Sequence, residues 1–348
     1  MSILTASELS QLTIDRLIFH LVGPDRSKNF QLLDEAPVTP HVDFILERIR
    51  ANAAGNLYEF DGASATLASL RAIGRNKFVT QSRELADRFQ EKHVGNALAG
   101  VFFVVLMSLK NNQKVVALMK MDHKDVLSYT VKSSNGRNKP DFSRIVNALT
   151  DEKNAVQKFA LARLNDKHDR LVVRDRSQNG IVPRYFEEFL DAKRVHTDEE
   201  LSAIVLDAVM NAIQKHRDEV DPTKRKNAYQ NVREAIQQGG NFDAEQPELF
   251  LALCLGVNDP DSPLIVEVKD RLRAQHLEGA TFAFKLADLA ASSRQEILTN
   301  EGVEIRCSKE DISAGIVKTS TSKGRTIITI TTSEILVDDE LPLKRTRK

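Results

Sequence analysis

Two apolar runs joined by a short polar segment constrain this chain more than any other feature. Val101–Leu109 and Val115–Met121 are rich in Val, Phe and Leu, and only Lys110–Lys114 separates them. Each run is too short to cross a bilayer, which takes about 20 residues. Two such runs around a polar turn predict a β-hairpin, largely buried, at the centre of the main sheet. Lys120 and Asp122, at the end of the second run, are predicted to leave the strand into solvent.

Length and charge limit the classes of protein to consider. The 348 residues exceed what one compact core usually holds, so two or three domains are expected. Lys plus Arg and Asp plus Glu number 49 each, so any DNA binding would come from a local patch rather than from net charge. Cys254 and Cys307 have neither metal-ligand spacing nor the pattern of a disulfide framework, which indicates a reducing cytoplasm. The N-terminus does not resemble a signal peptide, and no contact with a membrane is expected.

Strands and helices are predicted to alternate in the N-terminal half. Leu12–Val22 is predicted as a strand, with His20 as a packed or surface histidine. Thr39 precedes Pro40 and is expected to cap a helix, and Ser82 is expected to cap another. The pattern of Lys153–Leu164 favours a helix, and Leu171–Val173 a strand.

The second half is mainly helical in pattern. Phe186, Phe189 and Leu190 fall on one helical face and predict core or dimer packing. Thr197 opens a capping box, and Asp221-Pro222 begins another helix, which Gly239-Gly240 ends. Gly302–Ile305 and Gly324–Thr331 have the composition of strands.

These elements predict an α+β fold in four parts. Residues 1–180 form an N-terminal domain, a mixed sheet with flanking helices around the buried hairpin. Residues 181–275 form a helical region, residues 276–335 a small C-terminal β-containing region, and residues 336–348 a disordered basic tail.

Several of these motifs, in this order, resemble the bacterial nucleoid-associated protein family, the NdpA/YejK-like class. The motifs are Gly100 before the hairpin, the Lys120-Met121-Asp122 step, Tyr185–Leu190 and the closing pair of strands. The similarity runs from Leu12 to about Thr331. It implies a protein of the cytoplasm and nucleoid that binds double-stranded DNA, forms a homodimer and helps to organise the chromosome. It also implies association with type II topoisomerases and no cofactor.

Because the chain is neutral, DNA would be held by phosphate contacts from separate patches, which do not read base sequence. We expect the segment 132–140 to be an exposed loop, and Lys224–Lys226 to lie at a helix start. The candidate DNA-binding residues are Arg137, Lys139, Lys224, Arg225, Lys226, Lys344, Arg345, Arg347 and Lys348.

Two other classes of function stay open. Asp261, Glu267 and Lys269 resemble the PD-(D/E)xK pattern, in which carboxylates hold a divalent metal and Lys steadies the attacking water. That would make the chain a metal-dependent nuclease or a phage-defence effector. The third possibility is a scaffold that binds only protein. No other catalytic, metal-binding or cofactor motif is recognised.

Overall fold

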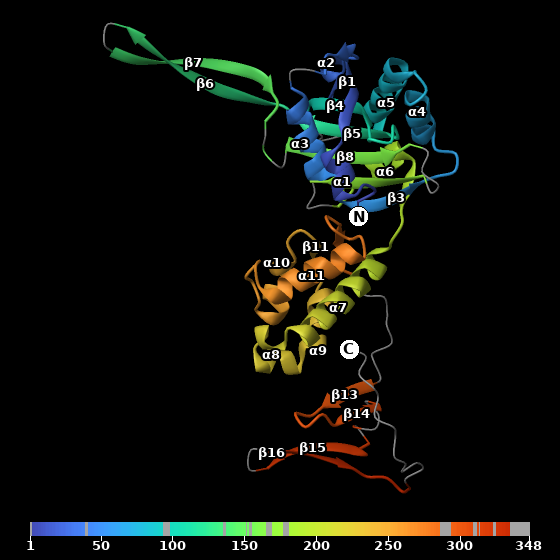
Figure 1. The fold of residues 1–348 in the computed structure, drawn as a ribbon, viewed down its shortest axis with the longest axis vertical. Helices are drawn as coiled ribbons and strands as arrows, with labels where there is room; N and C mark the ends of the chain where they lie inside the picture. Colours follow the sequence, from blue (N-terminus) through green and yellow to red (C-terminus); the bar gives the residue numbers. More distant parts are fainter. Residues whose placement is uncertain are drawn as a thin grey trace. The chain divides into compact units, whose positions relative to one another are not determined.

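The computed structural model describes residues 2–38, 41–92, 98–134, 137–150, 152, 155–164, 169–176, 181–285, 294–308, 312, 314–322 and 325–334. The chain divides into two compact units, Met1–Leu286 and Ala287–Lys348. The first contains an eight-stranded sheet with its helices and a helical part, and the second contains two small hairpins (Figure 1). The predicted α+β class is therefore confirmed.

The sheet has the strand order β10-β3-β9-β8-β5-β4-β1-β2, and every pairing in it is antiparallel, which refines the expectation of a mixed sheet. Its strands are β1 (Thr13–Val22), β2 (Glu35–Ala36), β3 (Asn56–Phe60), β4 (Gly100–Ser108), β5 (Lys114–Asp122), β8 (Val156–Arg163), β9 (Arg170–Asp175) and β10 (Ala192–Arg194). The predicted central hairpin is β4–β5, and every residue of β4 is buried. A Cβ atom at Gly100 would lie 2.2 Å from the Met121 carbonyl oxygen, so the start of β4 needs glycine.

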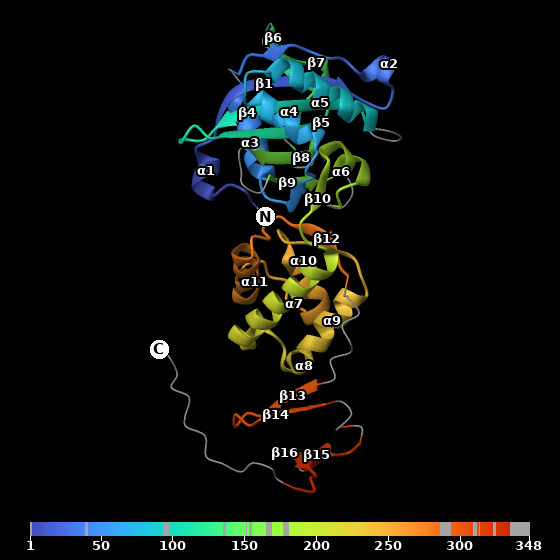
Figure 2. The same ribbon diagram turned by 90° about the vertical axis from the view of Figure 1, so that its right-hand side faces the viewer.

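Helices cover both faces of the sheet (Figures 1 and 2). Successive residues of a strand point to opposite faces. Phe102 and Val104 accordingly pack with α4 (Ala65–Ile73), α5 (Phe78–Lys92) and α6 (Arg184–Leu190). The alternate residues Val101 and Phe103 pack with α3 (Val42–Asn52) on the other face, where α1 (Ala6–Ser10) also lies. A further short helix, α2 (Arg26–Asn29), follows β1.

An aromatic cluster joins α5 and α6 to the sheet. The ring of Phe89 stacks on Phe102 with centroids 4.6 Å apart and meets Phe189 edge-on at 5.1 Å. Phe186 stacks parallel to Phe189, and both are buried. The predicted packing face of α6 is confirmed, and its side chains belong to the core of the first unit.

Two predicted local structures in the N-terminal half are wrong. Lys153–Leu164 is not a helix, because Val156–Arg163 is strand β8, whose side chains are buried on both faces and so lack a helical period. Ser82 does not cap a helix, because α5 begins at Phe78 and Ser82 lies inside it. The expected cap at Thr39-Pro40 lies outside the described residues.

The helical part has its own core, which Leu201, Val205, Leu251 and Leu264 help to form. It contains α7 (Asp198–Lys215), a 3₁₀ turn (Arg217–Glu219), α8 (Pro222–Lys226), α9 (Ala228–Gln237), α10 (Pro247–Leu255), α11 (Pro263–Ala274) and the ribbon of β11 (Asn241–Asp243) with β12 (Thr281–Ala283). The Thr197 capping box, the start at Pro222 and the end before Gly239 are confirmed, but the predicted single helix between the last two is broken at Asn227 into α8 and α9. Residues 277–284, predicted as part of the C-terminal region, contribute to this core through Phe282 and its neighbours.

The second unit contains two antiparallel hairpins. β13 (Arg294–Leu298) pairs with β14 (Glu304–Ser308), and β15 (Val317–Ser322) pairs with β16 (Arg325–Ile330). The two predicted C-terminal strands are therefore confirmed. Among the described residues, no helix is both long and apolar enough to cross a membrane.

Truncating Phe189 tests the aromatic core. We expect Phe189→Ala to lower the free energy of unfolding by about 3–5 kcal/mol, because the ring is buried against Phe89, Phe102 and Phe186. Leu253→Ala is the control, since Leu253 is 82% exposed on α10 and its truncation should cost within about 0.5 kcal/mol. Urea denaturation measures both, and a Phe189→Ala variant with wild-type stability would contradict the packing.

Candidate nucleic-acid interface

A two-stranded ribbon leaves the sheet between β5 and β8 (Figure 1). It consists of β6 (Lys124–Ser134) and β7 (Arg137–Ala148), and we call residues 124–148 the arm. None of its described side chains is buried. The predicted loop 132–140 is thus wrong in form, because its described residues belong to two paired strands, β6 up to Ser134 and β7 from Arg137 onward.

The arm has two chemically different faces. Residues directly opposite each other in a ribbon share a face, and successive residues alternate. The apolar face carries Leu127, Tyr129 and Val131 of β6, with Pro140 and Phe142 of β7. The polar face carries Ser128, Thr130, Lys132, Lys139, Asp141 and Ser143, with Val126 and Ile145 near its base.

The arm is also positively charged, unlike the chain as a whole. It contains five basic and two acidic residues, a net charge of +3. Lys124 pairs with Glu152 at 2.6 Å, Lys132 with Asp141 at 2.5 Å, and Arg144 with Asp125.

Of the two residues predicted here, Lys139 is exposed and forms no ion pair with any described residue. It lies directly across the ribbon from Lys132. Arg137 is the first residue of β7, and only its backbone is described. The end of the arm therefore gathers basic residues on neighbouring strands, as phosphate binding requires.

The second predicted patch, on α8, is partly used inside the helical part. The Lys224 ammonium lies over Gly256, which ends α10, where the helix dipole favours a cation. Arg225 donates a 2.8 Å hydrogen bond to the Arg217 carbonyl and lies 3.6 Å from the Asp218 carboxylate. Lys226 is exposed. This patch is a weaker candidate than the arm, because Lys224 and Arg225 contact backbone groups of the helical part, whereas the Lys132–Asp141 pair of the arm is exposed to solvent.

The remaining predicted DNA-binding residues, Lys344, Arg345, Arg347 and Lys348, lie outside the described residues. The possible nuclease residues are described, and they do not converge. Glu267 and Lys269 stand two positions apart on helix α11, which directs them to different sides. Glu267 pairs with Lys215 and Arg271, and Lys269 with Glu248. Asp261 lies in the turn before the helix.

A basic depression that the sequence analysis did not identify lies at the end of α4. It has a volume of about 340 Å³ and is lined by Arg71, Arg75 and Lys77 with two alanines. Arg71 pairs with Asp169 at 2.6 Å. Cations are also favourable at the C-terminus of a helix for purely structural reasons, so this depression is a secondary candidate.

A row of four polar residues, interrupted by Phe102, crosses the sheet beneath α5 and α6. His20, Phe102, Lys120, Lys158 and Asp175 are successive partners on five adjacent strands, so their side chains share one face. The prediction that Lys120 leaves the sheet into solvent is wrong, because its side chain is 1% exposed.

The two buried lysines have anionic or polar partners. Lys120 pairs with Asp122 and donates a 3.0 Å hydrogen bond to the Gln157 side-chain oxygen. The Lys158 ammonium lies 2.5 Å from Asp175 and 5.2 Å from the centroid of the Tyr185 ring. Burial lowers the pKa of the Lys120 ammonium and raises the pKa of the Tyr185 phenol. Because each buried ammonium has a carboxylate partner, the row is a structural network and not a binding site.

His20 is held as a neutral imidazole. Its Nδ1 accepts a hydrogen bond from the Leu33 amide at 3.0 Å, so the proton lies on Nε2, which is 2.9 Å from the Ser82 hydroxyl. Burial, together with the positive charge of Arg83, lowers the pKa of His20 to about 4. The residue is packed, as expected.

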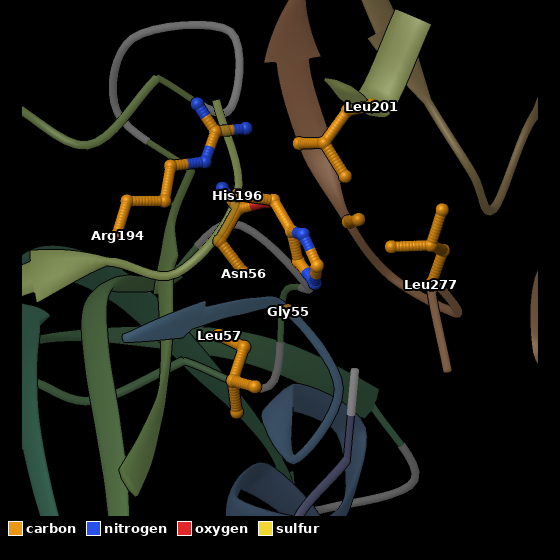
Figure 3. Close-up of a pocket in the computed structure, with 8 residues that line it drawn as sticks. Gly55, Asn56, Leu57, Arg194, His196, Leu201 and Leu277 are labelled. Carbon is orange, nitrogen blue, oxygen red and sulfur yellow. The ribbon is translucent and has the colours of Figure 1, made fainter. Parts of the chain in front are cut away.

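A small cavity lies where β3 meets the helical part (Figure 3). Asn56, Arg194, His196 and Leu277 are among its lining residues, and its volume of about 10 Å³ would hold one water molecule at most. Asn56 exchanges two hydrogen bonds with the Thr281 backbone, at 2.7 and 3.2 Å. The cavity is a gap in a packed joint and not a ligand site.

Comparison of the chain with protein-family models, curated proteins and solved structures finds no match.

Burial of His20 predicts how the free energy of unfolding depends on pH. The pKa of His20 is about 4 in the folded chain and about 6.5 when unfolded, so the unfolded state takes up the proton first as pH falls. This contribution to stability is complete above pH 6.5 and is lost as pH falls toward 4, by about 3 kcal/mol. Urea denaturation of wild type and His20→Gln across this interval should show the extra loss only in wild type. Parallel pH profiles for the two proteins would contradict it.

Proposed function

We propose that this chain binds double-stranded DNA through backbone phosphates, as a nucleoid-associated protein, and that the arm is its main DNA-contacting element. The observation that carries the proposal is the exposed ribbon with a net charge of +3 in a chain of zero net charge. Lys132 and Lys139, side by side on its polar face, are the residues placed to contact phosphate.

The dimensions of a two-stranded ribbon suit DNA. The major groove is about 12 Å wide and admits a β-ribbon as well as a helix. Lysines near the end of such a ribbon can reach the phosphates on either side of the groove. These contacts would position the protein without reading bases.

The resemblance to the bacterial nucleoid-associated family supports the same function. It adds a homodimer, a location in the cytoplasm and nucleoid, and association with type II topoisomerases to the proposal. The proposal includes no cofactor. It includes no metal-dependent cleavage through Asp261, Glu267 and Lys269 either, because Glu267 and Lys269 diverge on one helix.

Salt dependence of binding tests the proposal. Each lost phosphate contact lowers the slope of log affinity against log salt by about 0.9 for duplex DNA. We expect Lys132→Ser/Lys139→Ser to lower the slope by one to two contacts on any duplex sequence, because Lys132 must leave its exposed ion pair with Asp141 to bind phosphate. The comparison variant, Lys224→Ser/Arg225→Ser/Lys226→Ser, should change it less, since Lys224 and Arg225 have neighbours in the helical part.

Titrations of fluorescent duplexes at several salt concentrations, with and without Mg²⁺, provide the measurement. A wild-type slope in the Lys132→Ser/Lys139→Ser variant would remove the arm from the interface. No salt-dependent binding by the wild type would favour the protein-binding scaffold. Cleavage of the duplex that requires Mg²⁺ would favour the nuclease.

A further inference from the structure

We propose that the apolar face of the arm is the surface through which two copies of this chain pair. This inference rests on the homodimer in the proposed function and locates its contact on the face opposite Lys132 and Lys139; it does not depend on DNA binding.

The apolar face is exposed to an unusual degree. Leu127 and Tyr129 are each 68% exposed, Val131 is 58% exposed and Phe142 is 63% exposed. Single exposed apolar residues are common on proteins, but these four are contiguous, because Tyr129 and Phe142 are direct partners and Leu127 and Val131 flank Tyr129 on the same face. A contiguous patch of several hundred Å² marks an interaction site.

Among the described residues of the chain, no layer covers the arm, although a ribbon of this length needs one. Its strands have 11 and 12 residues, and each strand makes its extensive contacts with the other strand of the arm. An isolated two-stranded ribbon is marginally stable in water at best. A second arm laid face to face, about 10 Å away, would supply the missing layer.

The charges on the arm favour a second copy as that layer. Asp125 and Arg144 are the charged residues that border the apolar face, and they pair with each other. Lys132 and Lys139 lie on the opposite face. Two apolar faces can therefore meet without bringing like charges together, whereas DNA would find no unpaired cation among the described residues of that face.

The size and symmetry of the patch agree with pairing of identical chains. A two-fold axis brings the same patch of each chain together, so one self-complementary face is enough. Two such faces together bury on the order of 1,000 Å², near the lower limit for a specific interface. The pairing would leave the polar faces of both arms directed outward.

A tryptophan placed on the face would report its burial. The chain contains no Trp, so Phe142→Trp introduces a single fluorophore. We expect its emission to be blue-shifted and shielded from acrylamide at micromolar concentration, and to become exposed on dilution. The matched control is Lys139→Trp on the polar face, which should be exposed at every concentration.

Molar mass gives the second measurement. Tyr129→Ser/Phe142→Ser should raise the dissociation constant of the dimer by about a hundredfold or more, because aromatic residues dominate such interfaces. Lys132→Ser/Lys139→Ser should leave it unchanged. Light scattering of the full chain over a range of concentrations, with circular dichroism as the check on folding, measures both.

Three outcomes would overturn the inference. One is a wild-type chain that stays monomeric at tens of micromolar. Another is an unchanged dimer in the Tyr129→Ser/Phe142→Ser variant. The third is a shielded fluorophore in a Phe142→Trp variant whose mass is that of a monomer, which would show the face covered by its own chain. Loss of DNA binding with the dimer intact would count against the proposed function only.

Discussion

The architecture of the first unit depends on the burial of β4 and β5 on both faces. Hydrogen bonding to β1 and β8 leaves neither strand at an edge, and alternate side chains demand a layer above and a layer below. Helices α4, α5 and α6 supply one layer, and α3 the main part of the other. Because β5 and β8 are antiparallel neighbours, a short turn could join them. The chain instead inserts the arm at this point, between the end of β5 and the start of β8, which pair with each other.

The same constraint explains the buried charges. Lys120 and Lys158 occupy sheet positions that helices cover, so each ammonium needs a partner inside the protein. Asp122 and Asp175 supply those partners. Such pairs add little net stability, but removal of one member would leave an uncompensated charge in the core. The row therefore favours one register of β5, β8 and β9.

The sequence predicts secondary structure best where several local signals indicate the same element. The apolar runs around Lys110–Lys114, the capping box at Thr197 and the Asp221-Pro222 start of α8 all lead to the observed elements. Strand β8 could not be predicted from periodicity, because burial on both faces removes the alternation. The partners of Lys120 and Lys158 could not be predicted either, since they include residues of different strands. The arm had a usable signal: Leu127, Tyr129 and Val131 alternate with Ser128 and Thr130. Lys139 was identified as a candidate, while Lys132, its neighbour across the ribbon, becomes one only through the pairing register.

Hydrogen–deuterium exchange on the full chain, with and without duplex DNA at low salt, tests the central claim most directly. If the arm is the DNA-contacting element, amides in peptides spanning Val131–Asp141 should exchange more slowly when DNA is bound. Those of the buried strand β4 should not change, because they are already protected by the sheet. Protection confined to peptides outside residues 124–148 would contradict the account.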